Sequence, residues 1–231
     1  MIEQDRLAAA LALAHHAHRI QKRKGTDIPY IAHPMAVASL VLEFGGSEDQ
    51  AIAALLHDTI EDGGEAYADR IDEAFGPEVL AMVRDCTDGS FEHKAAVRTP
   101  HAKYAEWKAR KLAYMQHLRV IPADSPSLLV SACDKLHNAR AILADLRLLG
   151  DALFARFTGR RDGTLWYYDE LAGIFADKGA APARSLNRAV AAMHAEASHA
   201  QAPSRMPSDG IGRPCNLDQS ATKPPPAHPL L

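Results

Sequence analysis

Apolar residues recur at intervals of three and four along most of this chain, which is the spacing of an amphipathic helix. In the first such stretch Leu7, Leu11, Ala14 and His18 follow this spacing, and they predict a helix over residues 3–22. No stretch shows the alternation of apolar and polar positions that is typical of a half-buried strand. The pattern therefore predicts an all-α fold.

Prolines, glycines and capping residues indicate where the helices begin and end. Pro34 suits the first turn of a second helix, which the glycine pair at 45–46 ends. The sequence SEDQ from Ser47 has the form of a capping box, and the helix after it is expected to run unbroken to the glycines at 63–64. Thr164 is the expected cap of a later helix. The other helices are predicted over residues 66–76, 77–88, 102–119, 125–148 and 182–200, with a surface loop over 89–101.

These elements suggest a three-part organisation. Residues 1–178 are expected to form a compact multi-helix bundle, and residues 179–201 an appended helical segment. From about residue 202 the chain is rich in proline, serine and glycine and ends in KPPPAHPLL. Such a composition buries too little apolar surface to offset the entropy of ordering, so residues 202–231 are expected to be a disordered, Pro-rich tail.

Composition narrows the possible partners. The chain has 231 residues, of which 47% are hydrophobic and 24% charged, and a formal net charge of −3. This charge gives no general attraction to nucleic acid or to anionic membranes, so an anionic ligand must be held by local cations. There is no basic signal-peptide start and no apolar run of ~20 residues that could span a membrane. Three widely spaced cysteines indicate the reducing cytoplasm. The oligomeric state stays open.

The first candidate for chemistry is the stretch ALLHDTIEDGG. His57 and Asp58 follow an apolar run, and Glu61 and Asp62 lie four positions further on, one helical turn away from them. Buried carboxylates are costly unless they are paired or bind a cation. The alternative is a hydrogen-bonded core histidine beside a solvated helix end.

Two further stretches supply matching groups. Asp134 and Asn138 are four positions apart on one face of an apolar helix, and His33 directly precedes a helix-starting proline. Together His33, His57, Asp58 and Asp134 offer two nitrogen and two oxygen donors, a set suited to Mn, Fe, Co or Zn. An ion pair with a lysine or arginine elsewhere is the alternative role for Asp134.

The flanking residues extend these motifs. The chain contains RK followed by PYIAHP, then ALLHDTIED, then DKLHNAR, in that order. This set resembles the hydrolase domain of the Rel/SpoT alarmone enzymes of the HD superfamily, and in particular the stand-alone small alarmone hydrolases that include the metazoan SpoT homologue. The resemblance covers roughly residues 3–175. It implies a Mn²⁺-dependent enzyme in an all-α HD domain.

The resemblance also implies a role for each matching position. It gives one Mn²⁺ ion the four ligands His33, His57, Asp58 and Asp134. Glu61 and Asp62 would orient and deprotonate the attacking water. The implied nucleotide contacts are Arg23, Lys24, Asn138 and Tyr168, with Tyr167 as the alternative to Tyr168.

The predicted reaction removes the 3′-pyrophosphate of (p)ppGpp and releases GDP or GTP with pyrophosphate, which is the activity of a guanosine-3′,5′-bis(diphosphate) 3′-diphosphatase. Two alternatives stay open: an HD hydrolase acting on another nucleotide, such as NADPH or a deoxynucleotide, and a non-catalytic metal- or nucleotide-binding sensor. The Glu61–Asp62 pair argues against a sensor, because binding needs no water-activating carboxylates. Too few residues follow Asp177 for a synthetase module to be expected. The stretch between Cys86 and Trp107 departs from the family pattern, and Cys133 is expected to serve packing.

Overall fold

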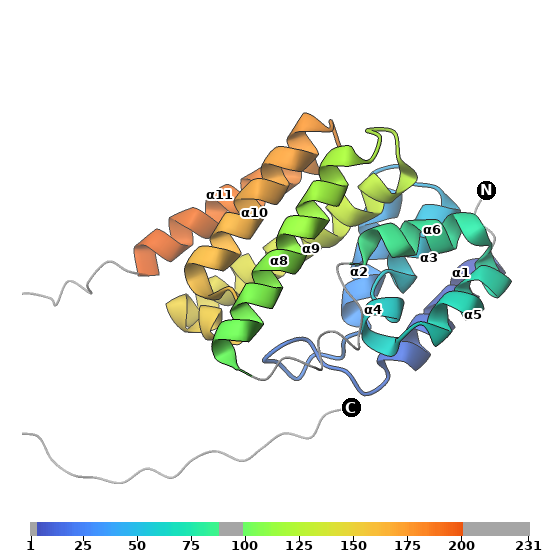
Figure 1. Cartoon of the computed structure of the whole chain (residues 1–231), viewed down its shortest axis with the longest axis horizontal. Helices are drawn as coiled ribbons and strands as arrows, with labels where there is room; N and C mark the ends of the chain where they lie inside the picture. The colour runs from blue at the N-terminus through green and yellow to red at the C-terminus, as the bar shows by residue number, and fades with distance from the viewer. Residues whose placement is uncertain (1–3, 88–98, 201–231) are drawn as a thin grey trace, which may run out of the picture.

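The computed structural model describes residues 4–87 and 99–200, and within these ranges the chain is helical with no named strand, which confirms the all-α prediction (Figure 1). Its α-helices are α1 (Gln4–His18), α2 (Ala32–Glu43), α3 (Glu48–Leu56), α4 (Thr59–Gly63), α5 (Ala66–Phe75), α6 (Pro77–Cys86), α8 (Pro100–Val120), α9 (Pro126–Leu149), α10 (Arg160–Asp177) and α11 (Ala183–Ala200), with a 3₁₀ helix η1 (Gly150–Arg156) after α9. The predicted Pro-rich tail lies outside the described residues, as does most of the predicted loop at 89–101.

The N-terminal half packs around α3. This helix contacts α1, α2, α6 and α9, and its residues 51–56 are all buried. The predicted capping box is present, because the Ser47 hydroxyl accepts from the backbone N–H of Gln50 while the Gln50 side chain accepts from the backbone N–H of Ser47. The capping box therefore determines where α3 begins. The helix is apolar along residues 51–56 because neighbouring helices cover it.

The C-terminal half is arranged along α9, which lies beside α10 and α11 and also contacts α2, α3 and α6 (Figure 1). Leu186 and Met193 of α11 are fully buried, so this helix packs into the bundle through its apolar face. None of the described helices is long and apolar enough to cross a membrane. Because α9 touches both halves, a polar residue on its buried face lies near the centre of the molecule.

The structure corrects two expected helix boundaries near the predicted site. The first helix ends at His18 rather than residue 22, because the chain turns back into a short antiparallel bridge between Lys22 and Pro29. The third helix does not run unbroken to the glycines at 63–64. It ends at Leu56, and the backbone of Asp58, with φ −97° and ψ −4°, separates α3 from α4. The carboxylate of Asp58 does not cap α4 and is left for other contacts.

A third correction concerns Thr164, which is buried inside α10 and does not cap it. Helix α10 begins at Arg160, before Thr164, and the two glycines at its start, Gly159 and Gly163, pack against Trp107. A Cβ atom at Gly159 would lie 2.6 Å from the indole ring of Trp107, and one at Gly163 would lie 3.0 Å from it. Close approach of α8 to α10 therefore needs both glycines.

This packing gives a stability prediction. Gly159→Ala is expected to destabilise the fold by about 1–3 kcal/mol, because the ring of Trp107 has to move to admit a methyl group. Gly173→Ala in the same helix is the matched control: its Cβ meets nothing within 4 Å, and alanine should stabilise the helix by up to about 1 kcal/mol. Urea unfolding of both variants measures the difference, and equal midpoints would contradict the packing role of Gly159.

Candidate metal centre and adjoining cleft

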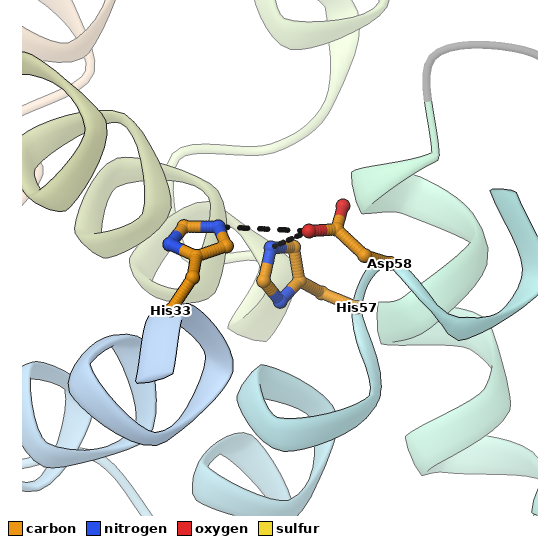
Figure 2. Close-up of side chains that lie close together, drawn as sticks. All are labelled: His33, His57 and Asp58. Carbon is orange, nitrogen blue, oxygen red and sulfur yellow. Dashed lines mark ion pairs between the residues drawn. The ribbon is translucent and has the colours of Figure 1, made fainter. Parts of the chain in front are cut away.

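The side chains predicted as metal ligands converge from three parts of the fold. His33 lies in the first turn of α2, His57 and Asp58 at the junction of α3 and α4, and Asp134 in α9. One donor atom from each of His33, His57 and Asp58 lies within 4.8 Å of the other two (Figure 2). Asp134 is outside that trio but close to both imidazoles. The four residues are therefore neighbours although about a hundred positions separate His33 from Asp134 in sequence.

The donor atoms face one another at short range. The Nε2 atom of His57 lies 3.0 Å from Asp58 Oδ2, and that of His33 lies 3.5 Å from the same oxygen. Asp134 Oδ1 lies 3.1 Å from His33 Nε2 and 3.6 Å from His57 Nε2. Both imidazoles are 1% exposed and the Asp58 side chain is 17% exposed. A small cation among these atoms would have nitrogen and carboxylate donors while remaining open to the solvent side.

The hydrogen bonding of His57 fits a metal ligand. Its Nδ1 lies 2.8 Å from the carbonyl oxygen of Ala54, and because a carbonyl only accepts, Nδ1 carries the proton. In the neutral ring Nε2 then presents a lone pair. This buried Nε2 has no hydrogen-bond partner among the described residues, despite its short distance to Asp58. A metal-binding imidazole usually donates its other N–H to a carbonyl or carboxylate in this way.

His33 is held by a second histidine. Its Nδ1 lies 2.8 Å from Nδ1 of His137, so one ring donates and the other accepts. Burial is the main cause that lowers the pKa of His137 to about 4, with the guanidinium of Arg23 adding to it, and the neutral ring of His137 can accept this hydrogen bond near pH 7. In the tautomer in which His33 Nδ1 is the donor, the Nε2 atom of a neutral His33 is unprotonated and faces the carboxylates.

Each carboxylate has further partners. Tyr30 donates its hydroxyl hydrogen to Asp58 Oδ2 at 2.6 Å. Lys135 Nζ donates to Asp134 Oδ2, and Asn138 Nδ2 donates to Asp134 Oδ1, each at 2.6 Å. These donors fix the orientation of both carboxylates, as outer partners do in metal sites.

The electrostatics favour positive charge at the centre. Burial raises the pKa of Asp58, but the imidazole of His57 outweighs it and the pKa of Asp58 ends below its ordinary value. The pKa of Asp134 is likewise lowered, chiefly because Lys135 offsets the effect of burial. Burial alone would lower the pKa of His57, but the two carboxylates outweigh it and raise this pKa well above its ordinary value, so a cation bound here would take the place of a proton on Nε2. Burial lowers the pKa of His33. Two ionised carboxylates thus attract a cation.

The position of Tyr30 leads to a prediction. Tyr30→Phe should keep the ring packed beside His33, at a centroid distance of 5.7 Å, while removing the donor to Asp58. The affinity for a divalent metal ion is expected to fall about 10-fold, the lower range for losing an outer hydrogen bond to a ligand. Calorimetric titration with Mn²⁺ measures this change. Tyr104→Phe, on an exposed tyrosine, is the matched control, and an unchanged affinity of Tyr30→Phe would contradict the role given to its hydroxyl.

A cleft opens beside this centre. A cavity of about 740 Å³ is lined by Arg23, Lys24, Asp62 and Asn138 among others. A second cavity of about 360 Å³ is lined by Lys24, Glu61, Arg110, Lys111, Trp107 and Tyr167 among others. The two cavities share the lining residues Lys24, Ile142, Phe157 and Tyr168, so they form one extended cleft. Cations, carboxylates and aromatic rings all face it.

The residues predicted to contact substrate lie along this cleft. Lys24 and Tyr168 line both cavities. Asn138 is engaged at both ends of its amide, since its Oδ1 accepts from Arg23 Nη2 at 2.7 Å while its Nδ2 donates to Asp134. Asn138 therefore links the arginine of the cleft to the candidate metal centre. Its direct contact with substrate stays a prediction.

Several residues of the site were given no role by the sequence, although His137 was seen to lie beside Asp134 and Asn138. Tyr30 and His137 stand within the motifs PYIAHP and DKLHNAR, so a search for partners of the ligands could have found them. Arg110 and Lys111 reach the cleft from α8, and no local motif marks them. Their place depends on how α8 packs against α10.

Comparison with known proteins gives the family. The family model described as HD domain matches residues 10–165. A GTP pyrophosphokinase rsh of Brucella melitensis is 37% identical over 141 residues, which are 61% of this chain and 17% of that protein. A probable guanosine-3′,5′-bis(diphosphate) 3′-pyrophosphohydrolase of Synechocystis is 32% identical over 136 residues, 59% of this chain and 16% of that protein. The chain thus spans about one sixth of the length of these relatives.

Solved structures show the same fold. A metazoan ortholog of SpoT, described as hydrolysing ppGpp, superposes with a TM-score of 0.63 at 23% identity, covering 82% of this chain and 96% of that one. A protein of Listeria monocytogenes gives a TM-score of 0.55, also at 23% identity, with 68% of this chain and 96% of the other covered. With the family match over residues 10–165, these likenesses show that the chain belongs to the HD-domain family of metal-dependent phosphohydrolases and is similar to its Rel/SpoT members.

Proposed function

We propose that this protein is a Mn²⁺-dependent pyrophosphohydrolase that removes the 3′-pyrophosphate of (p)ppGpp in the cytoplasm. The main observation is the convergence of His33 Nε2, His57 Nε2 and Asp58 Oδ2 beside a cleft lined by cations and carboxylates. Asp134 would complete the ligand set. The unpartnered, buried Nε2 of His57 and the two ionised carboxylates support a divalent ion at this place.

The bound ion would act as a Lewis acid on the phosphoryl oxygens and lower the pKa of water. The other roles belong to side chains. His33, His57, Asp58 and Asp134 would hold the ion, and their outer partners keep them oriented. Glu61 and Asp62, which line the two connected cavities, would orient the attacking water and accept its proton.

In the proposed step one bond to phosphorus forms and one breaks. The oxygen of water bonds to the phosphorus that carries the 3′ oxygen, and the bond between this phosphorus and the 3′ oxygen breaks. One proton of the water passes to the Glu61–Asp62 pair, and the pair returns it to the departing 3′ oxygen, so that one water molecule is consumed and both carboxylates are regenerated. The products are pyrophosphate and GDP from the tetraphosphate, or GTP from the pentaphosphate.

The charge distribution supports an anionic nucleotide as substrate. The whole chain has a formal net charge of −3, yet Arg23, Lys24, Arg110 and Lys111 all line the cleft. In this proposal Arg23 and Lys24 contact the phosphates, while Asn138 and Tyr168 contact the nucleoside. Two of the similar proteins are described by activity on this class of compound: the metazoan protein as hydrolysing ppGpp, and the Synechocystis protein as a probable 3′-pyrophosphohydrolase.

A product assay tests this function. The purified protein is incubated with Mn²⁺ and ppGpp, with NADPH as a parallel substrate and EDTA as the control, and products are resolved by ion-exchange chromatography. We expect GDP and pyrophosphate only when the metal is present. Cleavage of NADPH while ppGpp survives would contradict the proposed substrate and favour an HD hydrolase that acts on another nucleotide. Binding of Mn²⁺ without turnover of either compound would favour a non-catalytic sensor.

A further inference from the structure

The segment that joins α1 to α2 brings the side chain of Gln21 against Asp62. Gln21 Nε2 donates to Asp62 Oδ2 at 2.9 Å, across 41 positions of sequence. A carboxylate can only accept, so the amide nitrogen must face Asp62 and the amide oxygen must face away from it. The orientation of the Gln21 amide therefore follows from the chemistry of its partner.

The amide oxygen of Gln21 is held in turn by a buried histidine. His18 Nδ1 lies 2.7 Å from Gln21 Oε1, and because this oxygen only accepts, His18 Nδ1 carries the proton. His18 is 2% exposed, and its ring packs on that of Tyr30 with centroids 4.8 Å apart. The hydrogen bonds thus run in one direction, from His18 through Gln21 to Asp62.

The backbone of Gln21 is tied down on both sides. Its N–H donates to the carbonyl oxygen of His18 at 3.0 Å, and its own carbonyl oxygen accepts from the N–H of Tyr30 at 2.9 Å. The bridge between Lys22 and Pro29 continues this pairing. The backbone pairing fixes where the side chain of Gln21 starts, and the hydrogen bond from His18 fixes its amide, so Gln21 can act as a fixed donor.

The orientation of the Asp62 side chain decides whether its carboxylate faces the cleft. Asp62 belongs to α4, a helix of only five residues, and it is half-buried at the edge of the larger cavity. Its side chain has several staggered rotamers, and only some direct the carboxylate into the cleft. A hydrogen bond from a fixed amide selects among them.

We propose that Gln21 is a positioning residue that holds the Asp62 carboxylate in the orientation needed to receive the proton of the attacking water, and that His18 fixes the amide of Gln21. The inference rests on the proposed function, because it deepens the role given there to Asp62. Gln21 acts through Asp62, so its loss should slow turnover more than it weakens binding.

Gln21→Met tests this proposal kinetically. Methionine has a similar length but cannot donate to a carboxylate, so kcat for ppGpp should fall about 10-fold or more, as expected when a catalytic group is misplaced by a fraction of an ångström to an ångström. The KM and the affinity for Mn²⁺ should change by less than about 3-fold, which is below the effect on kcat. Gln116→Met, at an exposed position of α8, is the matched control. A loss confined to KM, or none at all, would overturn the proposal.

A double-mutant cycle tests the part played by His18. His18→Phe keeps a ring against Tyr30 and removes the donor to Gln21, so kcat should again fall while Mn²⁺ binding persists. The double variant His18→Phe, Gln21→Met should be no slower than Gln21→Met alone, because both changes break one chain of hydrogen bonds. Two losses that multiply would show that His18 does not act through Gln21.

A crystal structure of Gln21→Met separates this inference from the proposed function. The Asp62 carboxylate should leave its present orientation or occupy more than one rotamer, whereas an unchanged single rotamer would overturn the positioning role. This readout needs no turnover. If the unaltered protein fails to cleave ppGpp while Asp62 still reorients in the variant, the proposed function is wrong and the positioning contact stands.

Discussion

Asp58→Ala is expected to lose both bound Mn²⁺ and turnover of ppGpp. Asp58 Oδ2 lies within 3.5 Å of the Nε2 atoms of both His33 and His57, and no other carboxylate among the described residues belongs to that trio of donors. Removing a direct ligand should cost at least as much metal affinity as the 10–100-fold known for outer partners, so we expect a fall of about 100-fold or more. The fold should persist, because this carboxylate does not cap α4.

Calorimetry with Mn²⁺ and the ppGpp assay measure the two losses separately. Asp72→Ala, at an exposed position of α5, is the matched control and should leave both unchanged. Retained metal together with normal turnover in Asp58→Ala would show that the site lies elsewhere in the protein.

Glu61→Gln is expected to separate metal binding from turnover. Glu61 lines the cleft rather than the group of donor atoms, so Mn²⁺ affinity should persist. An amide cannot accept the proton of the attacking water, and the rate should fall about 100-fold or more if Glu61 takes part in this transfer. Single-turnover kinetics with saturating Mn²⁺ measures the chemical step directly.

Glu73→Gln, at an exposed position of α5, controls for the change of charge. Unchanged turnover in Glu61→Gln would remove Glu61 from the mechanism and leave Asp62 as the remaining carboxylate of the pair. A loss of metal instead of rate would mean that Glu61 supports the centre and not the water.

The fold was predictable where local chemistry decides it. The capping box at Ser47 and Gln50 depends on residues three apart, and the structure confirms it. The break at His57 and Asp58 was not predictable from periodicity, because the apolar spacing continues through both residues. Similarly, Gly159 and Gly163 suggest a loop when only the sequence is considered. In the structure they lie against the ring of Trp107 from α8, which leaves no room for a side chain.

The candidate site also combines features that short motifs reveal with features that depend on contacts between distant segments. Its ligand-type residues stand in short motifs, so the sequence indicated His33, His57, Asp58 and Asp134, and the structure brings these four side chains together. Contacts between distant segments were beyond reach of the motifs. The hydrogen bond from Gln21 to Asp62 belongs to this second class, because it depends on the turn after α1.

The distribution of charge in the structure also agrees with the expectation from the sequence. A chain with a formal net charge of −3 was expected to hold an anionic ligand through local cations, and the cleft gathers cationic side chains from the segment after α1 and from α8. The carboxylates of the centre adjoin this cleft through two of its lining residues, because Tyr30 donates to Asp58 and Asn138 donates to Asp134. A centre that attracts a metal cation thus lies beside a cleft that attracts an anion, which is the arrangement that metal-assisted hydrolysis of a phosphate ester requires.

The most direct test of the metal centre is anomalous diffraction at the manganese edge from crystals grown or soaked with Mn²⁺. We expect a single strong peak bounded by His33 Nε2, His57 Nε2 and Asp58 Oδ2, with Asp134 beside it. A peak elsewhere on the protein, or none at this place when Mn²⁺ is shown to bind in solution, would contradict the proposed centre and the hydrolytic function derived from it.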